Sequence, residues 1–282
     1  MAFVGACGVG VGAVGSVASG FVCAAAGRCV VSRSRTRSVH GARFSRRVCT
    51  QQLSMKVQIE DALKSPKWPE QWPFKPQDFQ RQDESIDSYF YSQPRLVTHI
   101  DDDAIDALTK YYAKEIKPGS DVLDLCSSWI SHYPEDLPLN KVVGLGMNKY
   151  ELEQNKRLTS FDVVDLNRNP MMPYPDNSFD VITNVVSVDY LVKPLEIFKE
   201  MARVLRPGGK AIMSFSNRCF PTKVSAIWLR TNDAEHVFIV GSFFHYAGEF
   251  EPPKGIDISP RKLFGRSDPM YIVQATKKKL AD

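Results

Sequence analysis

Apolar positions beyond residue 100 follow two periods, one helical and one strand-like. The helical stripe covers 105–116, where apolar residues recur at spacings of three and four, and the Pro-Gly pair at 118–119 ends it. Five short runs rich in β-branched residues follow, and each predicts a strand: 121–125, 141–145, 161–165, 179–184 and 210–215.

Stretches whose apolar residues recur at helical spacing lie between several of these predicted strands. The stretch 149–157 predicts a helix after the second strand, and apolar positions from 191 to 205 predict another before the fifth. This alternation indicates an α/β domain with a Rossmann-like, doubly wound, mostly parallel sheet and helices on both faces.

Residues 1–54 differ in composition from everything that follows. They contain seven arginines and no Lys, Asp or Glu. Gly, Ala, Ser and Val dominate residues 2–27, which are too weakly apolar for a membrane span, so we expect no stable span. A leader that is rich in Arg and Ser and poor in acid is typical of an organelle transit peptide, and the early Phe3 resembles plastid transit peptides of red algae.

We therefore expect three parts and a location in the plastid (chloroplast). The parts are a cleaved transit peptide over 1–54, an irregular arm over 55–100 and one domain over 101–282. Cleavage is expected between Arg47 and Lys56. A mitochondrial location, or a membrane anchor or signal sequence in place of the transit peptide, stays open.

The basic character of the chain belongs to the leader. Lys and Arg number 36 against 32 Asp and Glu, but without the seven leader arginines 29 basic residues face the same 32 acids. A body without excess positive charge gives no support for nucleic-acid binding, so we expect none. Cys126 and Cys219, the two cysteines outside the leader, form neither a disulfide framework nor a zinc site, and no metal is expected.

Ligands of open α/β sheets lie beyond the carboxyl ends of the strands, so the residues there are the first candidates for binding. The first strand ends in Asp124-Leu-Cys-Ser-Ser-Trp-Ile, the second in Gly144-Leu-Gly-Met-Asn, and the third in Asp165-Leu-Asn. The block Pro173-Tyr-Pro-Asp-Asn-Ser-Phe-Asp precedes the fourth, and Phe198-Lys-Glu-Met-Ala-Arg-Val-Leu-Arg-Pro-Gly-Gly-Lys-Ala leads into the fifth.

In their order and spacing these motifs resemble the class I S-adenosylmethionine-dependent methyltransferases of the type 11 group, over residues 122–216. The last two blocks carry most of the resemblance. It implies S-adenosyl-L-methionine as the cofactor and a small-molecule acceptor. It also implies a seven-stranded sheet whose last strand, about 267–275, runs antiparallel after a helix over 233–246.

The resemblance also implies which residues hold the cofactor. The family has glycines where this chain has Cys126, Ser128 and Ile130, and it has a ribose-binding acid where this chain has Gly146. Asn148 then offers its amide oxygen to the ribose. The residues expected at the cofactor are Asp124, Cys126, Ser128, Asn148, Asp165, Leu166 and Val185. Trp129 either covers the ligand or blocks it.

Four residues are candidates for binding the acceptor: His99, Asp189, Asn217 and Arg218. Three of them have a structural alternative. His99 is equally a residue that starts a helix, Asp189 a helix cap and Arg218 a surface ion-pair partner.

A sulfonium carries its own leaving group, so methyl transfer is an in-line displacement that needs mainly positioning, and no catalytic residue is assigned. The alternative function is a catalytically inactive cofactor-binding or regulatory protein on the same fold. A nicotinamide-dependent dehydrogenase is disfavoured because no Gly-x-Gly-x-x-Gly follows the first strand. The sequence does not indicate an oligomeric state.

Overall fold

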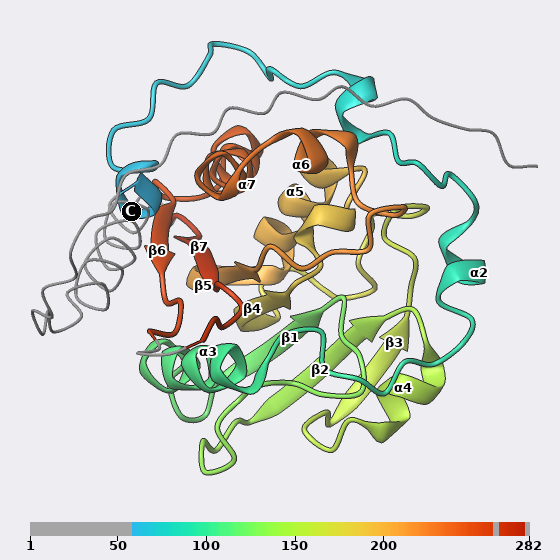
Figure 1. Ribbon diagram of the computed structural model, residues 1–282. Coiled ribbons are helices and arrows are strands. Elements are labelled where there is room, and N and C mark those ends of the chain that lie inside the picture. Colours follow the sequence, from blue (N-terminus) through green and yellow to red (C-terminus); the bar gives the residue numbers. More distant parts are fainter. Residues whose placement is uncertain (1–57, 262–264, 280–282) are drawn as a thin grey trace, which may run out of the picture. The chain divides into compact units, whose positions relative to one another are not determined.

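The structure of the chain is a computed structural model that describes residues 58–261 and 265–279 (Figure 1). These residues belong to one unit, 45–282. The predicted transit peptide and its predicted cleavage site lie outside the described residues, so both stay predictions.

A seven-stranded sheet with the order β3-β2-β1-β4-β5-β7-β6 forms the centre of this unit (Figure 1). β1 to β5 run parallel, whereas β7 pairs antiparallel with β5 and β6, so the predicted fold class is confirmed. The strands are β1 (Asp121–Leu125), β2 (Lys141–Gly146), β3 (Ser160–Val163), β4 (Phe179–Val185), β5 (Leu205–Phe215), β6 (Lys254–Asp257) and β7 (Tyr271–Thr276). The order reverses between β1 and β4, the usual place for a ligand in such sheets.

Helices cover the sheet and its ends. They are η1 (Pro76–Phe79), α2 (Asp87–Phe90), α3 (Asp102–Glu115), α4 (Lys149–Gln154), η2 (Val188–Tyr190), α5 (Pro194–Val204), α6 (Ala226–Arg230) and α7 (Asp233–Ala247). The Asp101 carboxylate caps α3 by accepting from the Ala104 N–H. Asn232 and Glu235 form a capping box at α7, which ends at Gly248 with φ of 84°.

The period of two along the strands sorts their side chains onto the two faces of the sheet. Leu123 and Leu125 of β1 lie in the apolar cluster that includes α5 and α7, whereas Val122 lies in the cluster that includes α3. The central strands are therefore buried on both sides, as a mostly parallel sheet requires.

Several predicted elements have shifted bounds in the structure. The predicted helix over 149–157 ends at Gln154, and β3 is displaced one residue toward the N-terminus. Leu205 begins β5 instead of ending the preceding helix. The 126–140 segment between β1 and β2 contains no helix, so His132 lies in a loop.

The described part of the arm, residues 58–100, packs along α7 and then runs toward the carboxyl ends of the strands. Trp72 lies 5.9 Å from Phe243 and 5.5 Å from Tyr246 between ring centroids. Ile59 and Leu63 are buried in the main core. The arm is therefore part of the folded core rather than an appendage.

A buried lysine fastens the next stretch of the arm. The Lys223 ammonium is 1% exposed and donates to the Ser85 carbonyl at 2.7 Å, with the Asp87 carboxylate at 3.3 Å. Arg81 donates to the same carboxylate at 2.7 Å. Burial by itself raises the pKa of Asp87, but these cationic partners lower it, and the pKa stays below its ordinary value. This ionic cluster fixes the arm beside the loop that follows β5.

No helix among the described residues combines the length and the apolar character that crossing a bilayer requires.

Candidate cofactor and acceptor site

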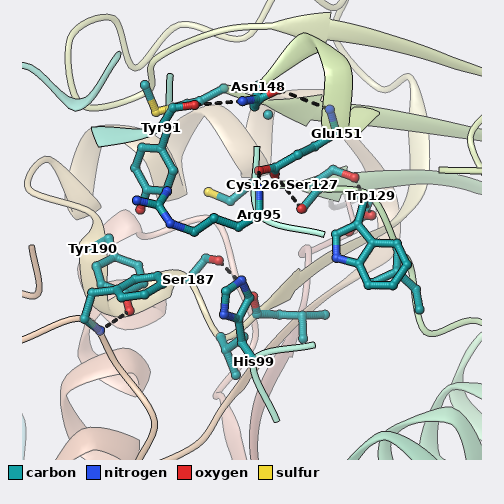
Figure 2. Close-up of a pocket in the computed structure, with 18 of the residues that line it drawn as sticks. Tyr91, Arg95, His99, Cys126, Ser127, Trp129, Asn148, Glu151, Ser187 and Tyr190 are labelled. Atoms are coloured by element: carbon teal, nitrogen blue, oxygen red, sulfur yellow. Dashed lines mark hydrogen bonds between the residues drawn. The ribbon is translucent and has the colours of Figure 1, made fainter. Parts of the chain in front are cut away.

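A cavity of about 350 Å³ lies at the carboxyl ends of β1, β2 and β4, beyond the point where the strand order reverses (Figure 2). Its walls come from the loop after β1, the ends of β2 to β4, the arm, and the segment after β5. The volume lies within the range of small-molecule sites. The predicted residues Asp124, Cys126, Ser128, Asn148, Asp165, Leu166, Val185, His99 and Arg218 all line it.

The first loop, residues 126–132, is held by side-chain hydrogen bonds. The buried Asp124 carboxylate accepts from the Ser127 hydroxyl at 2.7 Å and the Ser131 hydroxyl at 2.6 Å. Burial raises the pKa of Asp124, while these two donors act in the opposite direction. Cys126 adopts a left-handed backbone with φ of 58°, the conformation for which a glycine would be favoured.

The absence of an acid at position 146 has a steric cause in this structure. A Cβ atom on Gly146 would lie 2.2 Å from the Ser127 carbonyl oxygen, and the Ser127 N–H donates to the Leu145 carbonyl at 2.9 Å. The first loop therefore rests directly on the end of β2. The two departures from the family pattern are coupled, because this loop conformation leaves no room for a side chain at 146.

The carboxylate on the β2 side of the cavity comes from α4. Glu151 accepts from the Ser128 hydroxyl at 2.6 Å and from the Arg95 backbone N–H at 2.7 Å. The amide oxygen of Asn148 accepts from the Glu151 N–H as the cap of α4, and its Nδ2 donates to the Tyr91 carbonyl at 2.8 Å. Figure 2 shows both contacts of Asn148. The predicted ribose contact of Asn148 stays a prediction.

Asp165 begins the turn after β3 and borders the cavity. One carboxylate oxygen accepts from the N–H groups of Asn167 at 3.0 Å and Arg168 at 3.2 Å. Leu166 and Val164 supply apolar walls next to it. An acid beside apolar walls suits a flat base with an exocyclic amine, in agreement with the place expected for adenine.

The end of β4 contributes a second strained turn to the cavity wall. Val186 has φ of 42°, which is a rare conformation for a β-branched residue, and its N–H donates to the Ser214 carbonyl at 2.8 Å. Such backbone is retained where the surrounding structure holds it, and often at functional sites. Val185, Val186 and Ser187 all line the cavity.

Aromatic and basic residues form the opposite side, around the segment after β5. The Phe220 ring packs edge-on against His99 at 5.5 Å and lies 6.1 Å from Tyr190. The Tyr190 hydroxyl oxygen accepts a hydrogen bond from the Phe220 N–H at 2.7 Å, which fixes its position. Burial lowers the pKa of His99, so its imidazole is favoured in the neutral form. These residues enclose the space opposite the cofactor loops.

The structure separates the four residues predicted for the acceptor. His99 and Arg218 line the cavity, whereas Asp189 and Asn217 do not. The Arg218 side chain is 63% exposed and its Nε lies 4.0 Å from Asp268. Asp189 is buried away from the cavity lining, and both of its carboxyl oxygens lack a hydrogen-bond partner among the described residues. Burial raises the pKa of Asp189 to about 8.

Two further titratable groups of the cavity are held neutral. Burial lowers the pKa of His132 to about 4 and raises the pKa of the Cys126 thiol to about 12. A thiol in that state is a poor nucleophile, so Cys126 is a small apolar wall residue here. Within the described residues no group of His, Cys, Asp and Glu side chains is arranged to hold a metal ion.

Sequence reasoning missed Arg95, Tyr91, Glu151 and Phe220, which all line the cavity. Trp129, which it left open, lines the cavity and donates from its indole to the Val97 carbonyl of the arm at 3.0 Å. The arm has no clear period, so nothing in the sequence places its residues against the strand ends. The position of Glu151 in the first turn of α4 was the one available signal, since that turn faces the end of β2.

Residues 125–213 match the family described as "Methyltransferase domain". The demethylmenaquinone methyltransferase of Bacillus cereus (strain ATCC 10987 / NRS 248) is 35% identical over 107 residues, which cover 35% of this chain and 45% of that protein. The malonyl-[acyl-carrier protein] O-methyltransferase of Marinomonas sp. (strain MWYL1) is 30% identical over 66 residues, covering 23% of this chain and 24% of the relative. The chain thus spans less than half of the length of either relative.

Among solved structures, an S-adenosylmethionine-dependent methyltransferase from Mesorhizobium loti aligns with a TM-score of 0.45 at 13% identity, over 61% of this chain and 100% of the other. The [4+2]-cyclase SpnF aligns with the same TM-score at 18% identity, over 62% of this chain and 82% of the other.

The strand order and the cavity beyond β1 and β4 define a doubly wound α/β domain whose candidate ligand site lies at the strand ends. Residues 125–213 match the methyltransferase-domain family, in agreement with the resemblance to S-adenosylmethionine-dependent methyltransferases found in the sequence. The cofactor of that class is S-adenosyl-L-methionine.

Proposed function

We propose that the chain is an S-adenosylmethionine-dependent methyltransferase that acts on a small-molecule acceptor by direct in-line transfer. The observation that carries this proposal is the cavity at the switch point, with polar loops on the β1 to β3 side and aromatic residues on the other. The Bacillus cereus and Marinomonas relatives, a demethylmenaquinone and a malonyl-[acyl-carrier protein] methyltransferase, support an acceptor outside the nucleic acids.

The residues of the cavity fit the cofactor at its two ends. Asp165 and the apolar Val164 and Leu166 suit the adenine, and the first loop with Val185 suits the methionine portion. Glu151 is the carboxylate on the β2 side, where the family pattern has an acid on the strand itself. The bound cofactor supplies an electrophilic methyl group with a neutral thioether as its leaving group.

The protein's own contribution is then to orient the acceptor and to exclude water. Positioning of this kind contributes about 7–11 kcal/mol to lowering a barrier. His99 is the neutral imidazole nearest the aromatic side of the cavity, and it is placed to accept a proton from an acceptor whose nucleophile is protonated.

Calorimetric titration of the full chain with S-adenosylmethionine, S-adenosylhomocysteine and NADH tests the proposal. We expect a heat of binding with both adenosyl ligands and none with NADH. The absence of a heat signal with the adenosyl ligands would contradict the proposal. Asp165→Ala should weaken binding of S-adenosylhomocysteine by about tenfold, the equivalent of one charge-assisted hydrogen bond. The matched control is Asp162→Ala, an exposed carboxylate on β3 that does not line the cavity.

A catalytically inactive binding or regulatory protein is the second candidate, and the glycine-free first loop resting on Gly146 favours it. The two functions differ in turnover. Incubation with cofactor carrying a labelled methyl group and a plastid extract gives a labelled small molecule under the first proposal. Binding of the cofactor without any labelled product supports the second.

We also propose that residues 1–54 direct the protein to the plastid, on the strength of their Arg-rich and acid-free composition. Fusion of these residues to a fluorescent protein tests this directly. Plastid fluorescence is expected, and a mitochondrial or secretory pattern would contradict it.

A further inference from the structure

Of the Lys and Arg residues in the described part of the arm, Arg95 lines the cavity. Its backbone N–H is fixed by the Glu151 carboxylate at 2.7 Å. Its guanidinium lies over the Phe90 ring at 4.4 Å, with Phe220 at 5.6 Å and Tyr91 at 6.0 Å. Figure 2 shows the side chain reaching across the cavity toward Tyr91. Three aromatic rings therefore hold the cation in a defined place.

The charge of this guanidinium is not compensated. Its Nη1 atom is buried without a hydrogen-bond partner, and no carboxylate of the described residues forms an ion pair with it. The nearby acids are already engaged: Asp87 accepts from Arg81 and Asn167, and Glu151 from backbone and hydroxyl donors. A buried donor that is left unpaired is destabilising, and more so when the group is charged.

Two carboxylates are candidates for this guanidinium, that of the cofactor and one on the acceptor, and its location bears on the choice. The cofactor loops belong to β1, β2 and β3, whereas the rings around Arg95 come from the arm and from Phe220 after β5. β5 lies beyond β4 in the sheet, on the side away from β2 and β3. Phe220 therefore brings the guanidinium to the acceptor side, while the Arg95 backbone is tied to Glu151 on the β2 side, so the guanidinium lies where the two halves of the cavity meet.

We propose that Arg95 binds a carboxylate of the acceptor, so that the substrates of this protein are acidic small molecules. The inference rests on the proposed methyltransferase function and names the substrate class of the same cavity. A guanidinium held by rings presents its N–H groups in a fixed plane, which suits a carboxylate better than a point charge would. Arg218 is less suited to this role, since it is largely exposed and faces Asp268.

Benzoate and its neutral isostere benzamide are probes of this site. The full chain, with and without saturating S-adenosylhomocysteine, is titrated with each probe, and binding is followed by ligand-observed NMR. We expect benzoate to bind about tenfold more tightly than benzamide, as a charge-assisted hydrogen bond implies. Arg95→Gln should remove that preference, and Arg95→Lys should keep part of it, because a charge remains without the planar fork.

Arg230→Gln is the matched control, since Arg230 of α6 pairs with Asp78 of η1 outside the cavity and its loss should leave the preference unchanged. Affinity for S-adenosylhomocysteine should stay within about twofold in Arg95→Gln, and the melting temperature identifies a variant that fails to fold.

Three results would overturn the inference. The first is equal binding of benzoate and benzamide by the unaltered chain. The second is a preference that survives Arg95→Gln or disappears equally in Arg218→Gln. The third is a loss of S-adenosylhomocysteine affinity as large as the loss for benzoate, which would assign Arg95 to the carboxylate of the cofactor. If S-adenosylhomocysteine fails to bind the unaltered chain, the proposed function fails instead, and the preference for benzoate is read from the titration without it.

Discussion

The ends of β1 and β4 are neighbours in the sheet, and both carry a buried aspartate and a residue forced to a positive φ. At β1 these residues are Asp124 and Cys126, with φ of 58°, and at β4 they are Asp189 and Val186, with φ of 42°. Asp124 accepts from two serine hydroxyls, whereas neither oxygen of Asp189 has a hydrogen-bond partner within 58–261 and 265–279.

The difference teaches that hydroxyl donors decide which buried acid also fastens a loop. Both carboxyls are at most 4% exposed, and burial raises the pKa of both. At Asp124 the serine hydroxyls oppose that rise and tie the glycine-free first loop to the carboxyl, whereas Asp189 has no such donors and its pKa is raised to about 8. Four changes break or sharpen this comparison, in decreasing order of expected effect.

Removing the Asp124 carboxylate, which holds the first loop at β1, should have the largest effect on stability. Asp124→Ala leaves the Ser127 and Ser131 hydroxyls without their acceptor, and we expect a loss of about 3 kcal/mol in the free energy of unfolding. Asp124→Asn keeps one acceptor oxygen at similar volume and should lose about 1 kcal/mol. Urea denaturation measures both. Equal losses in the two variants would show that the hydroxyl contacts do not hold the loop.

The contact of the first loop with the end of β2 is tested by replacing two glycines of that strand. A Cβ at Gly146 meets the Ser127 backbone oxygen at 2.2 Å, whereas one at Gly144 meets the flexible end of Leu158 at 2.5 Å. Gly146→Ala should therefore cost about 2–3 kcal/mol of stability by overpacking, and Gly144→Ala about 1 kcal/mol. Thermal and urea unfolding compare the two. A cost for Gly146→Ala no larger than that for Gly144→Ala would contradict the coupling of loop and strand.

The unpartnered acid at β4 should make stability depend on pH. The folded pKa of Asp189, about 8, lies above the ordinary value of an aspartate, so the folded state binds more protons between about pH 4 and 8. Stability contributed by the protonated acid is thus full below about pH 4 and is lost as the pH rises through that window.

Asp189→Asn should flatten this dependence and raise stability at pH 8, as measured by urea unfolding from pH 5 to 8. Asp136→Asn, which alters an exposed carboxyl, is the control and should leave the slope unchanged. Parallel slopes for the unaltered chain and Asp189→Asn would show that Asp189 is ionised in the folded protein.

The smallest effect is expected at the strained position of the first loop. Cys126→Gly supplies the residue that a φ of 58° favours but loses a half-buried side chain, so the free energy of unfolding should change by less than about 1 kcal/mol. Cys126→Val places a β-branched side chain there and should destabilise by about 2 kcal/mol. Comparable stability of the Gly and Val variants would mean that the loop relaxes to another conformation.

The sequence alone determined the order of β1 to β5 with α3, α4 and α5, and the edge of the sheet where a ligand is expected. These follow from local patterns, because the period of apolar residues reports which face of each element is buried. The strand ends containing Asp124 and Asp165 were found in this way, and both residues line the cavity.

Tertiary structure alone decided which side chains meet at that edge. Arg95 and Glu151 are 56 positions apart, and their contact depends on where an aperiodic arm crosses the sheet. The same holds for the Ser127 oxygen above Gly146 and for the turn that directs Asp189 away from the cavity. Such contacts arise from the packing of separate elements, and no period in the chain encodes them.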